Sequence, residues 1–200
     1  MNKILIQNPR IINEGRSFIG SVLVEGDKIA AVFEGEVPGN VRAEANQVID
    51  ATGKWLIPGV IDDQVHFRDP GLTHKGDIGT ESRAAVAGGV TTFMDMPNTK
   101  PQTTTIADLE WKFNRAAEVS RANYSFFFGG TNDNMDEIRK LDRSRVPGLK
   151  LFLGSSTGNM LVDKKESLER IFGEAGMLIA IHAEKEEVIK RNIAHYTGLY

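Results

Sequence analysis

The sequence predicts an α/β fold that contains the first five strands of a (β/α)8 barrel of the TIM type, preceded by a small β domain. Three observations support this prediction. Short apolar runs and turns fill the start of the chain, strand-like and helix-like segments alternate after Pro58-Gly59, and polar side chains stand where the strand-like segments end. Residues 1–57 are therefore assigned to the β domain and residues 58–200 to the barrel.

The β domain is predicted from apolar runs that are separated by turn residues. These runs are KILIQ, SVLVEGDKIAAVFEG, QVID and KWLIPG. In the second run, Gly26-Asp27 lies between two apolar stretches, which is typical of a hairpin turn. We therefore expect a small unit of short strands up to residue 57.

The barrel is predicted from strand and helix patterns that follow each other in regular alternation. Strands are expected at residues 60–67, 90–96, 124–128, 148–153 and 177–183, and helices at 77–87, 106–120, 135–141, 164–172 and from about Glu184 onward. Such βα units favour a parallel sheet or a barrel. Because five strands do not close an eight-stranded barrel, we expect the chain to be the N-terminal part of a longer protein.

The composition is that of a globular protein with a small-molecule partner. Hydrophobic residues make up 40% of the chain and charged residues 26%, and the 24 Lys and Arg residues are spread along a chain of net charge −3. Without a basic patch, no nucleic-acid partner is expected. No apolar run reaches the roughly 18 to 20 residues of a membrane span, so we expect a cytoplasmic protein without a membrane partner. Cysteine is absent, which leaves histidines and carboxylates as the expected metal ligands.

Polar side chains at the ends of the predicted strands define the candidate site. His66 and Arg68 end the first strand, Asn98 follows the second, Lys150 lies in the fourth and His182 ends the fifth. In a (β/α)8 barrel, the C-terminal ends of the strands form the active site, whereas an open doubly wound sheet would scatter these residues. We therefore expect all five side chains to face a common centre.

Each residue near the first two strands also has a simpler interpretation. A lone His66 can hydrogen-bond the next loop, and Asn98 can belong to a turn within MPNTKP. Arg68 can form a surface ion pair with Asp69 or Asp77, but its guanidinium also suits a bidentate bond to a ligand carboxylate. The turn at residues 69–71 leads the backbone sharply out of the strand, which favours the ligand interpretation.

The later strands offer two further candidates. Lys150 lies in an apolar strand, where a lysine must find a partner or lose its charge, so it is a candidate ligand or one half of a buried ion pair. His182 ends another apolar strand, as a metal ligand or as a cap for the helix near Glu184. His74 and His195 have no convergent neighbours, and we expect both to be solvated.

Four motifs together resemble the dihydroorotases, cyclic amidohydrolases of the amidohydrolase superfamily. In order, they are PGVIDDQVHFRDPGLTHKGDI, AAVAGGVTTFMDMPNTKP, GLKLFLG and IAIHAE. The resemblance covers nearly the whole chain. It implies reversible, metal-dependent hydrolysis of L-dihydroorotate to N-carbamoyl-L-aspartate in pyrimidine biosynthesis. It also implies a (β/α)8 barrel, a β-sandwich domain built from both ends of the full-length chain, and zinc at the strand ends.

The resemblance assigns roles to the candidate residues. His66 would bind the first metal, Lys150 would bridge two zinc ions as a carbamate, and His182 would bind the second metal. Arg68 and Asn98 would hold the substrate carboxylate. The family's catalytic base and its sixth-strand histidine have no counterpart before Tyr200. We therefore expect no catalytic base within these 200 residues, and no activity from them alone.

The chemistry of the residues favours a dihydroorotase over related enzymes. Hydrolysis of a cyclic amide needs an activated water and a polarised carbonyl, which zinc provides. Hydantoinases and allantoinases share the metals, but their substrates lack the carboxylate that Arg68 would select. Three alternatives stay open: such a related enzyme, an inactive dihydroorotase-like subunit that supports a partner such as a transcarbamoylase, and an unrelated α/β binding protein. A homodimer or an association with another pyrimidine-pathway enzyme is also expected.

Gln64 departs from the family pattern and supports the inactive-subunit alternative. It stands where the family has the first histidine of His-x-His, and an amide oxygen is a poorer zinc ligand than imidazole. Strand alternation places Asp62, Gln64, His66 and Arg68 on one face, so Asp62 is the nearby carboxylate, deeper in the barrel. We expect one or two zinc ions, with the first site the weaker.

The first prediction is that Gln64→His strengthens this first site in the full-length protein. After equal dialysis, the wild type should retain about one tightly held zinc and the variant should approach two, the family's two-metal pattern. Metal analysis of both proteins, beside an activity assay, checks the prediction. Two tightly held zinc ions in the wild type would show that Gln64 or Asp62 is a competent ligand.

Overall fold

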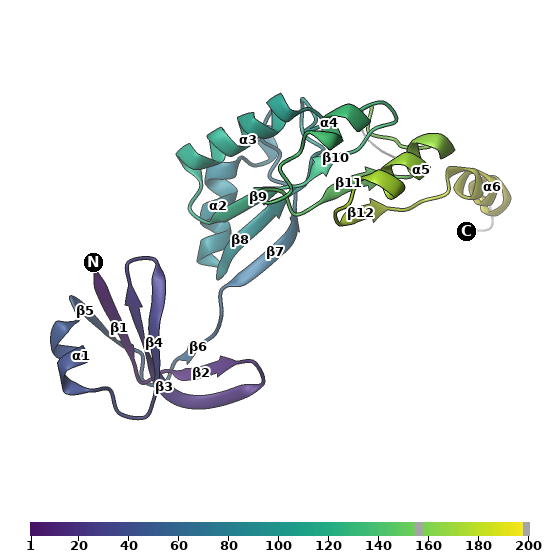
Figure 1. Cartoon of the computed structure of the whole chain (residues 1–200). Coiled ribbons are helices and arrows are strands. Elements are labelled where there is room, and N and C mark those ends of the chain that lie inside the picture. The colour runs from purple at the N-terminus through teal and green to yellow at the C-terminus, as the bar shows by residue number, and fades with distance from the viewer. Residues whose placement is uncertain (155–157, 198–200) are drawn as a thin grey trace. The chain divides into compact units, whose positions relative to one another are not determined.

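The computed structural model describes residues 1–154 and 158–197, and the chain divides into two compact units (Figure 1). The first unit is Met1–Gly59 and the second is Val60–Tyr200. Among the described helices, none is both long enough and apolar enough to cross a membrane. Each unit has its own strand pairing, and the candidate site residues all belong to the second.

The first unit is a mostly antiparallel sheet with one short helix. Its elements are β1 (Lys3–Gln7), β2 (Arg10–Asn13), β3 (Arg16–Glu25), β4 (Lys28–Glu34), α1 (Gly39–Glu44), β5 (Gln47–Asp50) and β6 (Trp55–Leu56). The strand order is β5-β1-β3-β2-β6, and β4 also pairs with β3. The expected hairpin joins β3 to β4, with Glu25 opposite Lys28 and Gly26 at a positive φ of 61°. These residues form one six-stranded sheet, so the β-sandwich stays a prediction.

The second unit alternates strands and helices along the whole of its length. Its elements are β7 (Val60–Val65), η1 (Thr73–Lys75), α2 (Ile78–Ala87), β8 (Val90–Asp95), α3 (Ile106–Val119), β9 (Asn123–Phe126), β10 (Phe128–Gly129), α4 (Met135–Arg139), β11 (Leu149–Phe152), α5 (Lys165–Glu174), β12 (Ile179–His182) and α6 (Glu186–Tyr196). The predicted strands and helices of this unit are confirmed, with ends that differ by one to a few residues. The predicted third strand is divided into β9 and β10 at Phe127.

The strands of the second unit pair in parallel and in chain order. One sheet has the order β7-β8-β9 and the other β10-β11-β12. Phe127 alone separates β9 from β10; its N–H donates to Asp95 O at 3.0 Å, and the next N–H, of Phe128, donates to Gly148 O at 3.1 Å. The five strands thus form a curled half-barrel, with each strand beside its predecessor. In a doubly wound sheet, the order of the strands would reverse after the first few, so that later strands would lie on the other side of the first one.

Helices cover the outer face of this half-barrel and bury an apolar core (Figure 1). Phe93 of β8 and Phe126 of β9 are fully buried, and the ring of Phe113 in α3 meets that of Phe126 edge to face at 5.1 Å. Burying one such ring contributes about 1.5–3 kcal/mol. Successive residues of a strand point to opposite faces of the sheet. The residues that alternate with those packed against the helices therefore point to the concave face. Lys150 is one of them, since its neighbours Leu149 and Leu151 belong to the outer core.

Helix caps fix where the loops of the site end. Asp77 caps α2, because its side chain accepts a hydrogen bond from Thr80 N at 2.9 Å while Thr80 Oγ1 accepts one from Asp77 N. Thr105 caps α3, because its Oγ1 accepts a hydrogen bond from Asp108 N at 3.2 Å. The loop after β7 therefore runs from residue 66 to 77, and the loop after β8 runs from 96 to 105.

Candidate active site

The loops after β7 and β8 pack against each other at backbone level. Lys100 N donates to Pro70 O at 3.1 Å. Gly71 has φ of +81°, and a Cβ added there would lie 1.8 Å from Lys100 O. A side chain at residue 71 would therefore push the two loops apart. This contact joins the loop that carries His66 and Arg68 to the loop that carries Asn98.

Arg68 reaches the site from the loop and not from the strand. The strand β7 ends at Val65, and its pairing with β8 shifts register between Asp62 and Val65. Arg68 itself has a left-handed backbone with φ of +60°. The prediction that strand alternation carries residues 62, 64, 66 and 68 on one face is therefore wrong, because the alternation is interrupted before Arg68. Leu72 N donates to Arg68 O at 3.0 Å, which closes the turn that follows.

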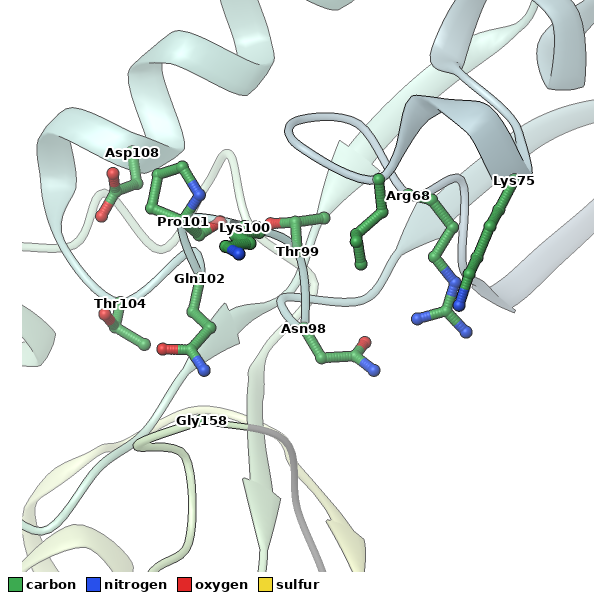
Figure 2. A pocket seen from close by; sticks show the side chains of 11 residues that line it. Arg68, Lys75, Asn98, Thr99, Lys100, Pro101, Gln102, Thr104, Asp108 and Gly158 are labelled. Carbon is green, nitrogen blue, oxygen red and sulfur yellow. Dashed lines mark hydrogen bonds between the residues drawn. The ribbon is translucent and has the colours of Figure 1, made fainter.

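Arg68 and Asn98 line the same pocket, as the sequence predicted. Its volume is about 810 Å³, and Figure 2 shows the Asn98 amide between the side chains of Gln102 and Arg68 in that view. Two lysines that the sequence analysis did not single out, Lys75 and Lys100, also line the pocket. The remaining lining residues are Leu72, Thr99, Pro101, Thr104, Asp108 and Gly158. Three cations against one carboxylate make this pocket suitable for an anion.

His66 is joined to the pocket through Asn98. The two atoms His66 Nδ1 and Asn98 Oδ1 lie 2.8 Å apart. An amide oxygen only accepts, so Nδ1 carries the proton and Nε2 keeps its lone pair. Burial lowers the pKa of His66, and the positive charge of Arg68 lowers it further against the opposing effects of Asn98 and Asp95. His66 is therefore held neutral, with Nε2 in the form that binds a metal.

Lys150 is a buried amine without a counter-charge. Its relative exposure is 5%, and no carboxylate of the described residues forms an ion pair with it. Its Nζ lies 5.3 Å from the centre of the Phe152 ring. Burial lowers the pKa of Lys150, which favours the neutral amine. The positive form of Lys150 also lowers the pKa of His66, so the two groups act on each other electrostatically. The buried ion-pair alternative finds no support here.

His182 ends β12 beside the strand of Lys150. The register pairs Lys150 with Ala180 and Phe152 with His182, whose rings lie 5.9 Å apart. The His182 side chain is 47% exposed, and its Nε2 lies 3.4 Å from Glu184 Oε1. His182 thus shares the strand edge with Lys150 but stays near solvent.

The donor atoms present suit zinc but do not complete a site. The imidazoles of His66 and His182 offer nitrogen donors, and a carbamate formed on Lys150 would offer oxygen donors. Among the described residues, no three His, Asp or Glu side chains gather around one point. His74 in η1 and His195 in α6 are exposed, as predicted for solvated histidines. Gln64 is exposed, and its backbone N donates to Asp62 Oδ1 at 3.1 Å, which occupies one oxygen of that carboxylate.

One buried pair beside the site was missed by the sequence analysis. Asp95 and Lys112 are both fully buried and form an ion pair. A signal was present, since Lys112 lies three residues after Leu109 and four before Ala116, and so on the buried face of the helix. Its partner in another element was not readable from the sequence.

The comparisons with known proteins point to one class of enzyme. Residues 53–142 match the model of the family described as dihydro-orotase-like. The chain is 35% identical over 190 residues to an allantoinase of Streptomyces avermitilis, covering 91% of this chain and 41% of the relative. It is also 35% identical over 193 residues to a dihydroorotase of Methanosarcina acetivorans, covering 94% and 40%.

Solved structures agree with the sequence relatives. The L-hydantoinase (dihydropyrimidinase) from Arthrobacter aurescens superimposes with a TM-score of 0.88 at 30% identity, over 100% of this chain and 44% of that one. A D-hydantoinase at 24% identity and a TM-score of 0.78 shows the same fold. The chain spans about two fifths of the length of the curated relatives it matches.

The half-barrel, the strand-end residues and these relatives define the class as the cyclic amidohydrolases. Within that class, the chain belongs to the dihydroorotase-like family and corresponds to the N-terminal portion of its members. The relatives are named for three different substrates at similar identity. Membership of the family therefore does not distinguish between these substrates.

The second prediction is that Gly71→Ala destabilises the full-length protein more than Gly89→Ala does. Both glycines have φ near +85°, but nothing lies within 4 Å of an added Cβ at Gly89. Backbone strain alone should cost Gly89→Ala about 1–2 kcal/mol. Gly71→Ala should cost about 3 kcal/mol or more, because the two loops must separate. Urea unfolding of both variants measures the difference, and equal losses would contradict the close loop contact.

Proposed function

We propose that the full-length protein carrying this chain is a dihydroorotase, a metal-dependent enzyme that hydrolyses L-dihydroorotate reversibly to N-carbamoyl-L-aspartate in pyrimidine biosynthesis. The observation that carries the proposal is the shared pocket of Arg68 and Asn98, with Lys75 and Lys100 beside them. Dihydroorotate is a cyclic amide with a free carboxylate. A guanidinium binds a carboxylate with two parallel N–H donors, and an amide adds a third donor.

The carboxylate separates this proposal from the other activities in the family. The rings that hydantoinases and allantoinases open lack this group, so a site built for them has no need of a half-buried arginine and two lysines. An inactive subunit is the other alternative, and Gln64 supports it. The retained pocket argues against that alternative, because Arg68 and Asn98 line it together and Asn98 also meets His66.

The residues that would hold zinc are His66, Lys150 and His182. Zinc supplies an activated water and polarises the ring carbonyl when it is bound. Asn98 orients His66 by accepting a hydrogen bond from Nδ1–H, which directs the Nε2 lone pair away from the amide. Arg68 and Asn98 hold the carboxylate so that the amide carbonyl faces the strand ends.

Lys150 is proposed to act as a carbamate. Its neutral amine attacks carbon dioxide, a new N–C bond forms, and the nitrogen releases one proton. The product is an anion with two oxygen donors, and bound zinc would balance its negative charge. Loss of this group would remove a ligand and leave a cavity at the base of the site.

The third prediction is that Lys150→Ala loses metal together with activity. In the full-length protein, zinc content after dialysis should fall and turnover should become undetectable, while added short carboxylic acids should restore part of both. Lys164→Ala, at an exposed lysine, is the matched control and should retain both. Metal analysis and an activity assay give the readouts. Full zinc content in Lys150→Ala would show that Lys150 is not a metal ligand and serves only in packing.

The fourth prediction is that Arg68→Lys weakens the reaction with dihydroorotate selectively. The positive charge remains but the two-donor geometry is lost, so kcat/KM should fall about 10- to 100-fold, since a hydrogen bond to a charged group contributes about 1.5–3 kcal/mol. Metal content should not change. Arg83→Lys, at an exposed arginine of α2, serves as the control. Normal turnover of dihydroorotate by Arg68→Lys would show that another residue binds the substrate carboxylate.

A further inference from the structure

A buried ion pair lies behind the loop that carries His66 and Arg68. Asp95 is the last residue of β8 and Lys112 lies in α3, and both side chains are fully buried. Lys112 Nζ donates to Asp95 Oδ2 and, at 3.2 Å, to the backbone oxygen of Met96. The same Nζ lies 4.8 Å from the centre of the Phe126 ring. The ammonium is therefore enclosed by one carboxylate, one carbonyl and one ring face.

The second oxygen of the Asp95 carboxylate leads to the site. Asp95 Oδ1 accepts a hydrogen bond from Phe67 N at 2.9 Å. Phe67 stands between His66 and Arg68, so this bond fixes the peptide between His66 and Phe67, one residue before Arg68. The carboxylate thus uses one oxygen for α3 and the other for the loop backbone. A pair that served only to fill the core would not need the second bond.

A second anchor from the same helix holds the other side of Arg68. Asp69 is 3% exposed, and its Oδ2 lies 3.4 Å from Arg115 Nε and 3.5 Å from Ile78 N. Lys112 and Arg115 are one helical turn apart on α3. The residues before and after Arg68 are therefore both tied, directly or through a carboxylate, to one helix. Arg68 lies between them with its left-handed backbone.

Burial of this ion pair costs free energy of desolvation. Both charges lose their hydration, and well-packed apolar residues of similar volume are often as stable or more stable. A buried pair that also holds a backbone N–H beside a functional residue has a further use, since small displacements of reacting groups cost rate steeply. Asp95 accepts from Phe67 N, next to His66 and Arg68, which is consistent with such a positioning role.

We propose that Asp95 and Lys112 are positioning residues for the site, and that their role is to hold Phe67 N and thereby set the places of His66 and Arg68. The proposal rests on the function proposed above for the same site. Neither side chain touches the substrate. Asp95 acts through the Phe67 peptide, and Lys112 acts by holding the Asp95 carboxylate in its orientation.

The test uses two double variants of the full-length protein, both of which remove the buried charges. Asp95→Asn with Lys112→Met keeps an oxygen that accepts from Phe67 N, and methionine fills the space of the lysine chain. Asp95→Leu with Lys112→Met has similar volume but offers no acceptor. The single variants are less informative, because each leaves one buried charge without its partner and endangers folding.

The two double variants should have similar melting temperatures but different activities. The Asn double variant should keep kcat/KM for dihydroorotate within about threefold of the wild type. The Leu double variant should lose about 100-fold, the scale expected when a reacting group is displaced by a small distance. Its KM should rise because Arg68 is displaced, and its zinc content should fall because His66 is displaced.

Hydrogen exchange separates this proposal from the proposed function. The amide of Phe67 should exchange faster in the Leu double variant than in the Asn double variant, while the amides of β11 should be unchanged in both. This comparison holds even if the wild type hydrolyses no dihydroorotate, a result that would overturn the proposed function alone. Equal protection of Phe67 in the two variants, or equal activity at equal stability, would overturn the positioning role.

Discussion

Parallel pairing of the strands in chain order is the constraint on which the rest of the second unit depends. Each strand lies beside its predecessor, so the carboxyl ends of β7, β8, β10, β11 and β12 share one edge. Residues that are far apart in the sequence meet there without any long-range loop. The contact between the loops after β7 and β8, and the register that places Lys150 near His182, both follow from this order.

The electrostatics of the site depend on what covers that edge. The outer face is packed by aromatic and aliphatic side chains against the helices, which leaves two lysines buried in different surroundings. Burial lowers the pKa of both lysines, but the Asp95 carboxylate opposes this effect at Lys112, whereas Lys150 forms no ion pair with the described residues. Lys112 is thereby held in an ion pair between β8 and α3, and Lys150 is the lysine proposed above to act as a carbamate.

Much of this fold was predictable from local patterns. The strands and helices of the second unit lie close to their predicted bounds, because apolar periodicity and residues such as Asp77 and Pro58-Gly59 mark them clearly. In the first unit, α1 and β2 were not predicted, since GNVRAE buries no residue and RIIN is very short. A sandwich in that unit was expected from the family resemblance, and the described strands form a single sheet.

The candidate site was predictable in its residues but not in its geometry. Arg68 and Asn98 were expected in one pocket and lie there. The left-handed turn at Arg68 and the bond from Phe67 N to Asp95 depend on contacts between elements, which no local pattern encodes. Lys75 and Lys100 were overlooked for a related reason, because surface-like lysines in loops become part of a pocket only when two loops meet. Roles as metal ligands stay predictions for His66, Lys150 and His182.

The most direct test of the account compares substrates with the purified full-length protein. Initial rates are measured with L-dihydroorotate, with hydantoin and with allantoin, before and after chelation and after zinc is restored. The account predicts a kcat/KM for dihydroorotate at least about 100-fold above that for either uncharged ring, because the cationic pocket is left unpaired without a carboxylate. Turnover should vanish on chelation and return with zinc. A higher kcat/KM for either uncharged ring would contradict the central claim that this pocket selects a carboxylate.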